Sequence, residues 1–185
     1  MKYLIASDIH GSLYYCEKLI EAFRREKADR LILLGDILYH GPRNDLPKGY
    51  DPKGVIALLN AHRERILCVR GNCDTEVDQM VLTFPILADF AALELGDKLV
   101  YLTHGHRYHI DQLPPLCKGD ILLYGHTHIP LCKEKNGVLC LNPGSVSIPK
   151  ENSPHSYMIY ESGVFLWKTL DGETYSEFIT SVERA

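Results

Sequence analysis

Five short apolar runs in this sequence of 185 residues each end in a motif that contains Asp, Asn or His. The runs are "KYLIAS", "LILLG", "ILCVRG", "LVYLT" and "ILLYG", and the motifs that follow them begin at Asp8, Asp36, Asn72, His104 and His126. Short apolar runs bounded by such residues are typical of buried strands. Because ligands bind at the carboxyl edge of an open α/β sheet, the pattern favours a fold that brings these five ends to one edge.

The two halves of the chain differ in their predicted elements. The first half alternates strands at 2–7, 30–36 and 65–72 with helices at 13–27 and 55–64, and a short helix begins at Asp74 or Thr75. The second half reads as hairpins on "GD" and "NG" turns and a closing meander from Ser156. We expect an α/β fold in which two sheets pack face to face with helices outside, as one domain spanning residues 1–185.

Composition excludes several classes of function. The net charge of −4 argues against sequence-specific nucleic-acid binding, which usually needs an excess of positive charge. The apolar segment that precedes Asp8 is too short for a secretory signal or a membrane-spanning helix, so we expect a cytoplasmic protein with no membrane partner. The six cysteines form no C-x-x-C pair and are expected to be reduced thiols.

The motifs contain side chains that bind metal ions. In "DIH", Asp8 and His10 are expected to leave the strand on the same side, and His126 and His128 repeat this spacing in "HTH". Each motif alone has another explanation, because Asp8 can cap a helix and Asn72 can hold a turn. Ligand-type residues at five strand ends together favour a metal site.

The blocks "DIHG", "GDIL", "GNCD", "THGH" and "GHTH", in this order, resemble the signature of the calcineurin-like metallophosphoesterases. The match spans residues 8–145, and "NPGS" is similar to the small bacterial phosphodiesterases of the YfcE type. The resemblance implies a four-layer α/β/β/α sandwich of two mixed sheets with a binuclear metal site. It implies that one ion is held by Asp8, His10 and His128, that the other is held by Asn72, His104 and His126, and that Asp36 bridges both.

Such a site is suited to hydrolysis of phosphate esters. Two divalent ions bound by only two carboxylates leave a net positive site that activates a bridging hydroxide and attracts a phosphate. A set of nitrogen and oxygen ligands fits Mn²⁺, with Ni²⁺, Co²⁺, Fe²⁺ and Zn²⁺ as alternatives. The expected enzyme is a metal-dependent phosphoric diester hydrolase that acts on a small phosphodiester.

Four residues are candidate catalytic groups: Asn72, His104, Cys73 and His106. Cys73 stands where many relatives have a histidine that resembles a general acid, and a thiol is a poor substitute. His106 and His109 are either accessory acids or solvated loop residues. The loop 39–52, with His40 and Arg43, either folds over the site and selects substrates or is a mobile surface loop.

Two other functions stay open at this stage. One is a metal-dependent phosphomonoesterase, and the other is a non-catalytic protein-binding scaffold, as in a retromer subunit of the same fold. The scaffold has an incomplete metal site, whereas all seven ligand positions are filled here. Apolar hairpins near Phe90 and Trp167 leave a homo-oligomer open, as a dimer or a tetramer.

Overall fold

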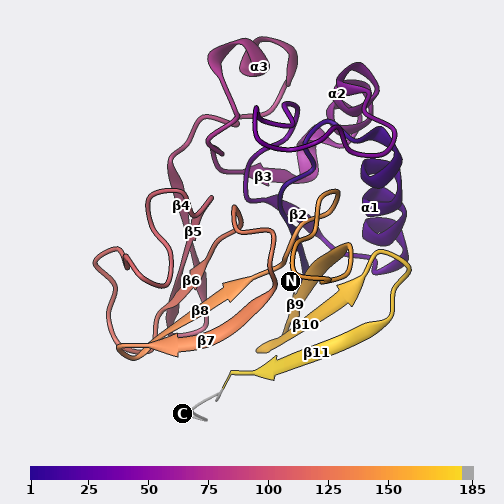
Figure 1. Cartoon of the computed structure of the whole chain (residues 1–185). Coiled ribbons are helices and arrows are strands. Elements are labelled where there is room, and N and C mark those ends of the chain that lie inside the picture. Colours follow the sequence, from indigo (N-terminus) through magenta and orange to yellow (C-terminus); the bar gives the residue numbers. More distant parts are fainter. Residues whose placement is uncertain (181–185) are drawn as a thin grey trace.

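Two mixed β-sheets form the centre of the fold (Figure 1). The computed structural model describes residues 1–180, so residues 181–185 of the predicted domain lie outside the described residues. The six-stranded sheet has the order β11-β10-β9-β1-β2-β3, and the five-stranded sheet has the order β4-β5-β6-β8-β7. The strands are β1 (Tyr3–Ala6), β2 (Arg30–Leu33), β3 (Ile66–Cys68), β4 (Phe90–Leu95), β5 (Lys98–Thr103), β6 (Ile121–Leu123), β7 (Leu131–Lys135), β8 (Val138–Asn142), β9 (Ser156–Glu161), β10 (Val164–Thr169) and β11 (Thr174–Ile179).

Residues of β1 alternate between two hydrophobic cores. Leu4 and Ala6 pack with the apolar faces of helices α1 (Leu13–Arg25) and α2 (Pro52–Asn60), which cover one face of the six-stranded sheet (Figure 1). Ile5 points the other way and packs with residues of the five-stranded sheet. The alternation of side chains along a strand therefore places one helical layer and one sheet on opposite faces of the first sheet.

The outer face of the five-stranded sheet has a different cover. Leu122, Tyr124 and Cys140 on this face pack against apolar side chains of the segment 110–116. Within residues 1–180 no helix lies in this segment, so an irregular loop fills the fourth layer that the resemblance implies. The α/β class and the two face-to-face mixed sheets are confirmed.

The helices begin and end close to their predicted positions. Helix α2 begins at Pro52 instead of residue 55, because the Asp51 side chain accepts a hydrogen bond from the Gly54 N–H and caps the helix. It ends at Asn60, and a 3₁₀ turn, η1 (Arg63–Arg65), follows. Helix α3 (Glu76–Val81) begins after a capping box at Thr75, as the sequence predicts.

The strands that precede the polar motifs run parallel to one another within each sheet. In one sheet β1, β2 and β3 are parallel, and in the other β5 and β6 are parallel. Their carboxyl ends lie at one edge of the sandwich, where the site described below is formed. Within residues 1–180, no helix is both long enough and apolar enough to span a membrane.

Candidate metal centre

Five of the seven predicted ligands have left-handed backbone conformations. The φ angles are 61° for Asp8, 50° for His10, 55° for Asp36, 66° for His126 and 62° for His128. Strand β1 ends at Ala6 and β6 at Leu123, so the expectation that strand alternation positions the "DIH" and "HTH" side chains is wrong. Tight left-handed turns after the strands position them instead, at a cost of about 1 kcal/mol or more for each non-glycine residue.

The first ligand group consists of Asp8, His10 and His128, whose ligand atoms lie within 4.8 Å of one another. All three residues are buried. Asp8 Oδ1 lies 3.2 Å from His128 Nε2 and 3.5 Å from His10 Nε2. This oxygen has no hydrogen bond of suitable geometry within residues 1–180, although it is fully buried. An unpaired buried carboxylate oxygen that faces two imidazole nitrogens suits a cation.

The second group contains Asp36, His104 and His126. His126 Nδ1 lies 3.2 Å from His104 Nε2, and the amide oxygen of Asn72 lies 3.1 Å from the same His104 nitrogen. Asp36 Oδ2 lies 3.4 Å from His104 Nε2 and 3.7 Å from His10 Nε2 in the first group. The structure thus brings all seven predicted ligands together and places Asp36 between the two groups.

Backbone carbonyls orient three of the imidazoles. The Nδ1 atoms of His10, His104 and His128 lie 2.7, 2.6 and 2.6 Å from the carbonyl oxygens of Tyr39, Leu34 and Ile148. A carbonyl oxygen only accepts, so each Nδ1 carries a proton and donates it. Each Nε2 is then directed into the site, as in the outer shell of many metal-bound histidines.

The electrostatics of the site favour a bound cation. Burial favours the neutral acid, yet the contacts of Asp8 with His10 and His128 hold the pKa of Asp8 well below its usual value. Burial lowers the pKa of His104, but the contact with Asp36 and the charge of Asp8 raise it to about 9. His10 Nε2 and His128 Nε2 face each other at 3.2 Å, and two lone pairs at this distance need a proton or a metal ion between them. The donor set therefore fits divalent metal ions.

Asp74 organises the loops of the second group, and the sequence analysis did not foresee this role. Its buried carboxylate accepts hydrogen bonds from the backbone N–H groups of Asp36, Ile37 and Gly71. A Cβ atom at Gly71 would collide with the backbone nitrogen of Asp36, so only glycine permits this approach. Of the two predicted helix starts, Asp74 and Thr75, the structure supports Thr75, which caps the helix.

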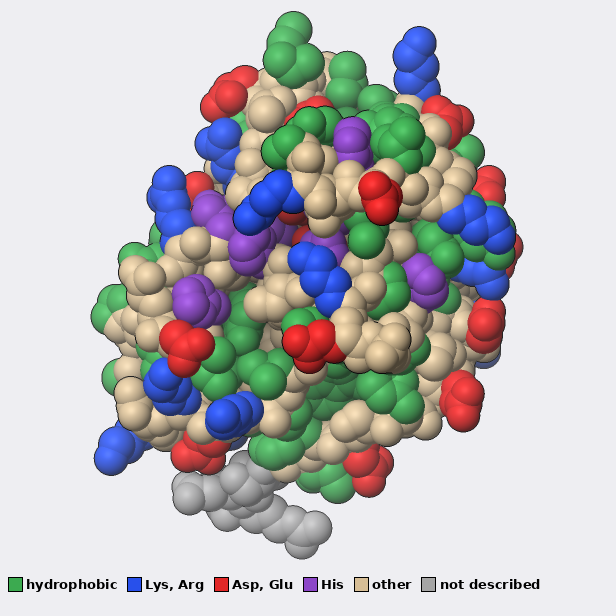
Figure 2. Space-filling view, in the orientation of Figure 1, with side chains coloured by type: hydrophobic (Ala, Val, Ile, Leu, Met, Phe, Trp, Pro, Cys, Tyr) green, Lys and Arg blue, Asp and Glu red, His purple; other side chains and the backbone are tan. Residues whose placement is uncertain are grey.

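A cavity of about 440 Å³ opens above the two groups. Figure 2 shows histidine side chains gathered around this hollow, with lysine and arginine side chains at its rim. Residues 41–44 of the predicted substrate loop line one part of the cavity, and Lys150 lines another. The loop is fastened to the rest of the chain by hydrogen bonds such as that from Ser12 Oγ to the Lys48 carbonyl at 2.6 Å. The loop therefore borders the site, and its role in selecting substrates stays a prediction.

The other predicted catalytic residues have different positions. Cys73 is buried beside Asp36, and its Sγ atom accepts a hydrogen bond of 3.2 Å from the Asn72 amide. Burial and the charge of Asp36 raise the pKa of the Cys73 thiol. His106 is exposed at the rim, with its ring centre 6.3 Å from that of His126. His109 lies further along the loop and pairs with Gln112 through the backbone.

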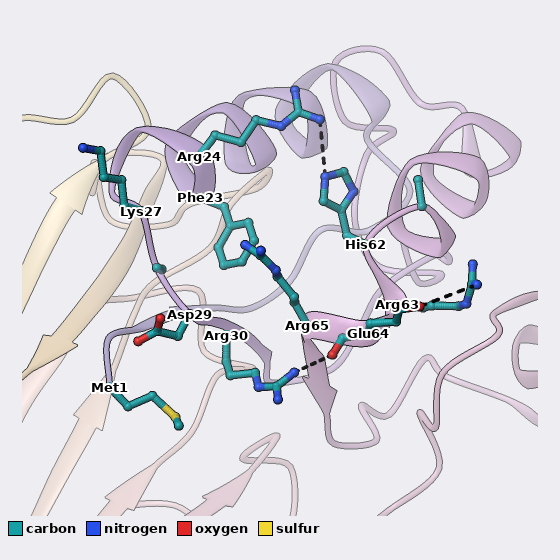
Figure 3. Close-up of a pocket in the computed structure, with 12 residues that line it drawn as sticks. Met1, Phe23, Arg24, Lys27, Asp29, Arg30, His62, Arg63, Glu64 and Arg65 are labelled. Carbon is teal, nitrogen blue, oxygen red and sulfur yellow. Dashed lines mark hydrogen bonds and ion pairs between the residues drawn. The ribbon is translucent and has the colours of Figure 1, made fainter.

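A larger cavity of about 1120 Å³ lies elsewhere, beside the carboxyl end of α1 (Figure 3). Its lining includes Phe23, Arg24, Arg30, His62 and Arg65. None of its residues belongs to the clusters of possible metal ligands found within residues 1–180. The size of a cavity therefore does not mark the site, whereas the clustering of carboxylates and imidazoles does.

Residues 1–163 match the family model of the calcineurin-like phosphoesterase superfamily domain. The chain belongs to this family. It is 48% identical over 164 residues to phosphodiesterase YfcE of Escherichia coli, with 89% of each chain covered. It is 30% identical to phosphodiesterase MJ0936 of Methanocaldococcus jannaschii, with 78% of this chain and 83% of the relative covered.

Solved structures agree with this assignment. The E. coli YfcE phosphoesterase superposes with a TM-score of 0.94 at 44% identity, with 98% of this chain and 100% of that chain covered. Vacuolar protein sorting 29 from Cryptosporidium parvum superposes with a TM-score of 0.60 at 20% identity, with 96% and 97% covered. The second likeness shows only that the fold is shared. The family resemblance drawn from the sequence is confirmed.

We predict that backbone strain at His126 can be measured in metal-free protein. The His126→Gly variant is expected to be about 1 kcal/mol more stable than His126→Ala, because glycine adopts a φ of +66° without steric cost. Urea denaturation of the two variants provides the comparison. At Val77, in helix α3, the order should reverse, because glycine disfavours a helix. Equal stability of the two His126 variants would contradict the strain.

The stability of metal-free protein is predicted to decrease between pH 6.5 and pH 8.5. The pKa of His104 is about 9 in the folded chain, above its ordinary value of 6.5. The contribution of protonated His104 to the free energy of unfolding is therefore complete below pH 6.5 and is lost as the pH rises through 9. The expected loss is about 2 kcal/mol, measured by urea denaturation. His104→Gln should flatten this dependence, and an equally steep decrease in that variant would refute the assignment.

Proposed function

We propose that this chain is a metal-dependent phosphodiesterase that holds two divalent metal ions, most suitably Mn²⁺. The observation that carries the proposal is the pair of ligand groups that meet at Asp36. The family and the 48% identity to an enzyme named phosphodiesterase support the reaction class. The completeness of the ligand set favours an enzyme over the scaffold alternative.

The proposed ligands divide into two sets. Asp8, His10 and His128 would hold one ion, and Asn72, His104 and His126 would hold the other. Asp36 would serve both, because only a carboxylate bridges two cations and also offsets charge. When bound, the ions would supply Lewis acidity that activates water and stabilises charge on the phosphate.

The remaining groups of the site position the ester. The Nδ2 group of Asn72 has a second proton besides the one directed at Cys73 Sγ, and this proton is available to a phosphate oxygen. Carbonyl contacts fix the rings of His10, His104 and His128, so the binding geometry exists before substrate arrives. His106 at the rim is the candidate accessory proton donor. Desolvation and the charge of the neighbouring His104 lower the pKa of His106, which weakens this residue as a proton donor near neutral pH.

The first functional prediction concerns metal content. Protein loaded with Mn²⁺ should contain two ions per chain, and Asp36→Asn should abolish turnover, because an amide neither bridges two cations nor offsets their charge. Elemental analysis and a hydrolysis assay measure the two effects. Asp97→Asn, in the turn between β4 and β5, is the control for loss of one carboxylate. One ion or none in catalytically competent protein would contradict the proposal.

The second functional prediction concerns the ester. The protein should hydrolyse bis(p-nitrophenyl) phosphate much faster than the alkyl monoester glycerol 2-phosphate, whose leaving group is an alkoxide. A binuclear site binds the more highly charged monoester at least as well, so the difference arises in departure of the leaving group. Expulsion of an alkoxide needs a proton donor, and Cys73 is a poor donor at a position where many members of the family have histidine. Diesters with acidic leaving groups need this donor least.

Cys73→His should raise the ratio of monoesterase to diesterase activity, because imidazole supplies a donor with a pKa near neutrality. Cys117→His, at an exposed cysteine, should leave the ratio unchanged. Rates with both esters, measured for the three proteins, provide the comparison. A wild-type preference for monoesters, or an unchanged ratio in Cys73→His, would show that this account of Cys73 is wrong.

A further inference from the structure

Two cationic side chains line the cavity above the metal groups. Arg43 belongs to the loop after β2, and Lys150 belongs to the segment after β8. Asp36 is the only carboxylate among the residues that line the cavity, and it is one of the proposed metal ligands. Arg43 and Lys150 therefore add positive charge to a cavity in which the metal ions would already exceed the charge of their ligands.

Neither side chain is engaged by the rest of the protein. Within residues 1–180, the guanidinium of Arg43 and the ammonium of Lys150 form no hydrogen bond and no ion pair. Two arginines of the larger cavity in Figure 3 differ in this respect. There Arg24 contacts the ring of His62, and Arg30 donates to the carbonyl of Glu64. Arg43 and Lys150 thus keep their charges available to a molecule in the cavity.

Hydrogen bonds hold the backbone of Lys150 next to a proposed ligand and fix the loop that carries Arg43. The Lys150 N–H donates to the carbonyl of His128 at 3.2 Å, and Ser153 Oγ donates to the carbonyl of Lys150 at 2.6 Å. On the other segment, the Asn44 side chain donates to the carbonyl of His40 at 2.7 Å. Long side chains on fixed backbone can reach over the cavity while their attachment points remain in place.

We propose that Arg43 and Lys150 bind a second anionic group of the substrate, a carboxylate or a phosphate distinct from the phosphodiester that is cleaved. This inference rests on the proposed phosphodiesterase function. A phosphodiester has one negative charge, which two divalent ions and the Asn72 amide are sufficient to bind. Two further unpaired cations match an anion on the part of the substrate that lies away from the scissile bond.

The test uses three p-nitrophenyl alkyl phosphodiesters that differ only in the group at the far end of a short alkyl chain. One ends in a carboxylate, one in a phosphonate and one in a neutral amide of similar size. The wild type should favour the two anionic esters over the amide by about fivefold or more in kcat/KM, mainly through KM, and this preference should weaken with salt. The carboxylate and phosphonate arms distinguish the two sources of the anion.

Arg43→Gln and Lys150→Gln should each weaken the preference for the anionic esters, measured as the kcat/KM of an anionic ester divided by that of the amide. In the double variant this ratio should be near one. Lys133→Gln, an exposed lysine on β7 without an ion pair within residues 1–180, controls for the change in net charge. Titration calorimetry with 3-phosphonopropionate and its amide gives a readout without turnover. The variants should weaken binding of the carboxylate form more than binding of the amide form.

The outcomes separate this inference from the proposed function. Equal use of all three esters by the wild type would overturn the inference and leave the phosphodiesterase intact. If Arg43→Gln and Lys150→Gln slowed the neutral and anionic esters equally, both cations would act on the scissile phosphate, and the inference would be wrong. Hydrolysis of none of the esters would refute the proposed function, while calorimetry would still decide whether Arg43 and Lys150 discriminate the carboxylate.

Discussion

Two buried carboxylates at the meeting edge of the sheets are the constraint on which the rest of the site depends. Asp8 and Asp36 are almost fully buried, and a buried anion is costly unless positive charge compensates it. In metal-free protein, histidines that have gained protons supply this charge, as the pKa of about 9 for His104 indicates. Two divalent ions would supply it more fully, and the ligand atoms are already directed at two points on either side of Asp36.

This arrangement reduces stability in exchange for function. Left-handed backbone at five non-glycine ligands stores conformational free energy that the two hydrophobic cores must offset. Hydrogen bonds from the backbone to Asp74 and from three histidines to carbonyl oxygens hold the strained loops in place. The expected consequence is a site that is rigid before it binds metal or substrate, on loops supported by parallel strands of both sheets.

Much of the fold and the location of the site could be predicted from the sequence, because both depend on local patterns. Apolar runs, the "GD" and "NG" turns and the cap at Thr75 are encoded by neighbouring residues, and the strands, hairpins and short helix agree with them. The left-handed turns were missed because aspartate and histidine adopt positive φ in only a small minority of cases, so Asp8 and His126 give a weak local signal. The contacts of Asp74 and the approach of Lys150 were missed because each depends on segments far apart in the chain.

The proposed function requires two metal ions at the edge where the strands end. Anomalous diffraction from crystals of the protein grown with Mn²⁺ tests it most directly. We expect two manganese peaks, one bound by Asp8, His10 and His128 and the other by Asn72, His104 and His126, with Asp36 in contact with both. A single peak, or peaks away from these residues in crystals of active protein, would contradict it.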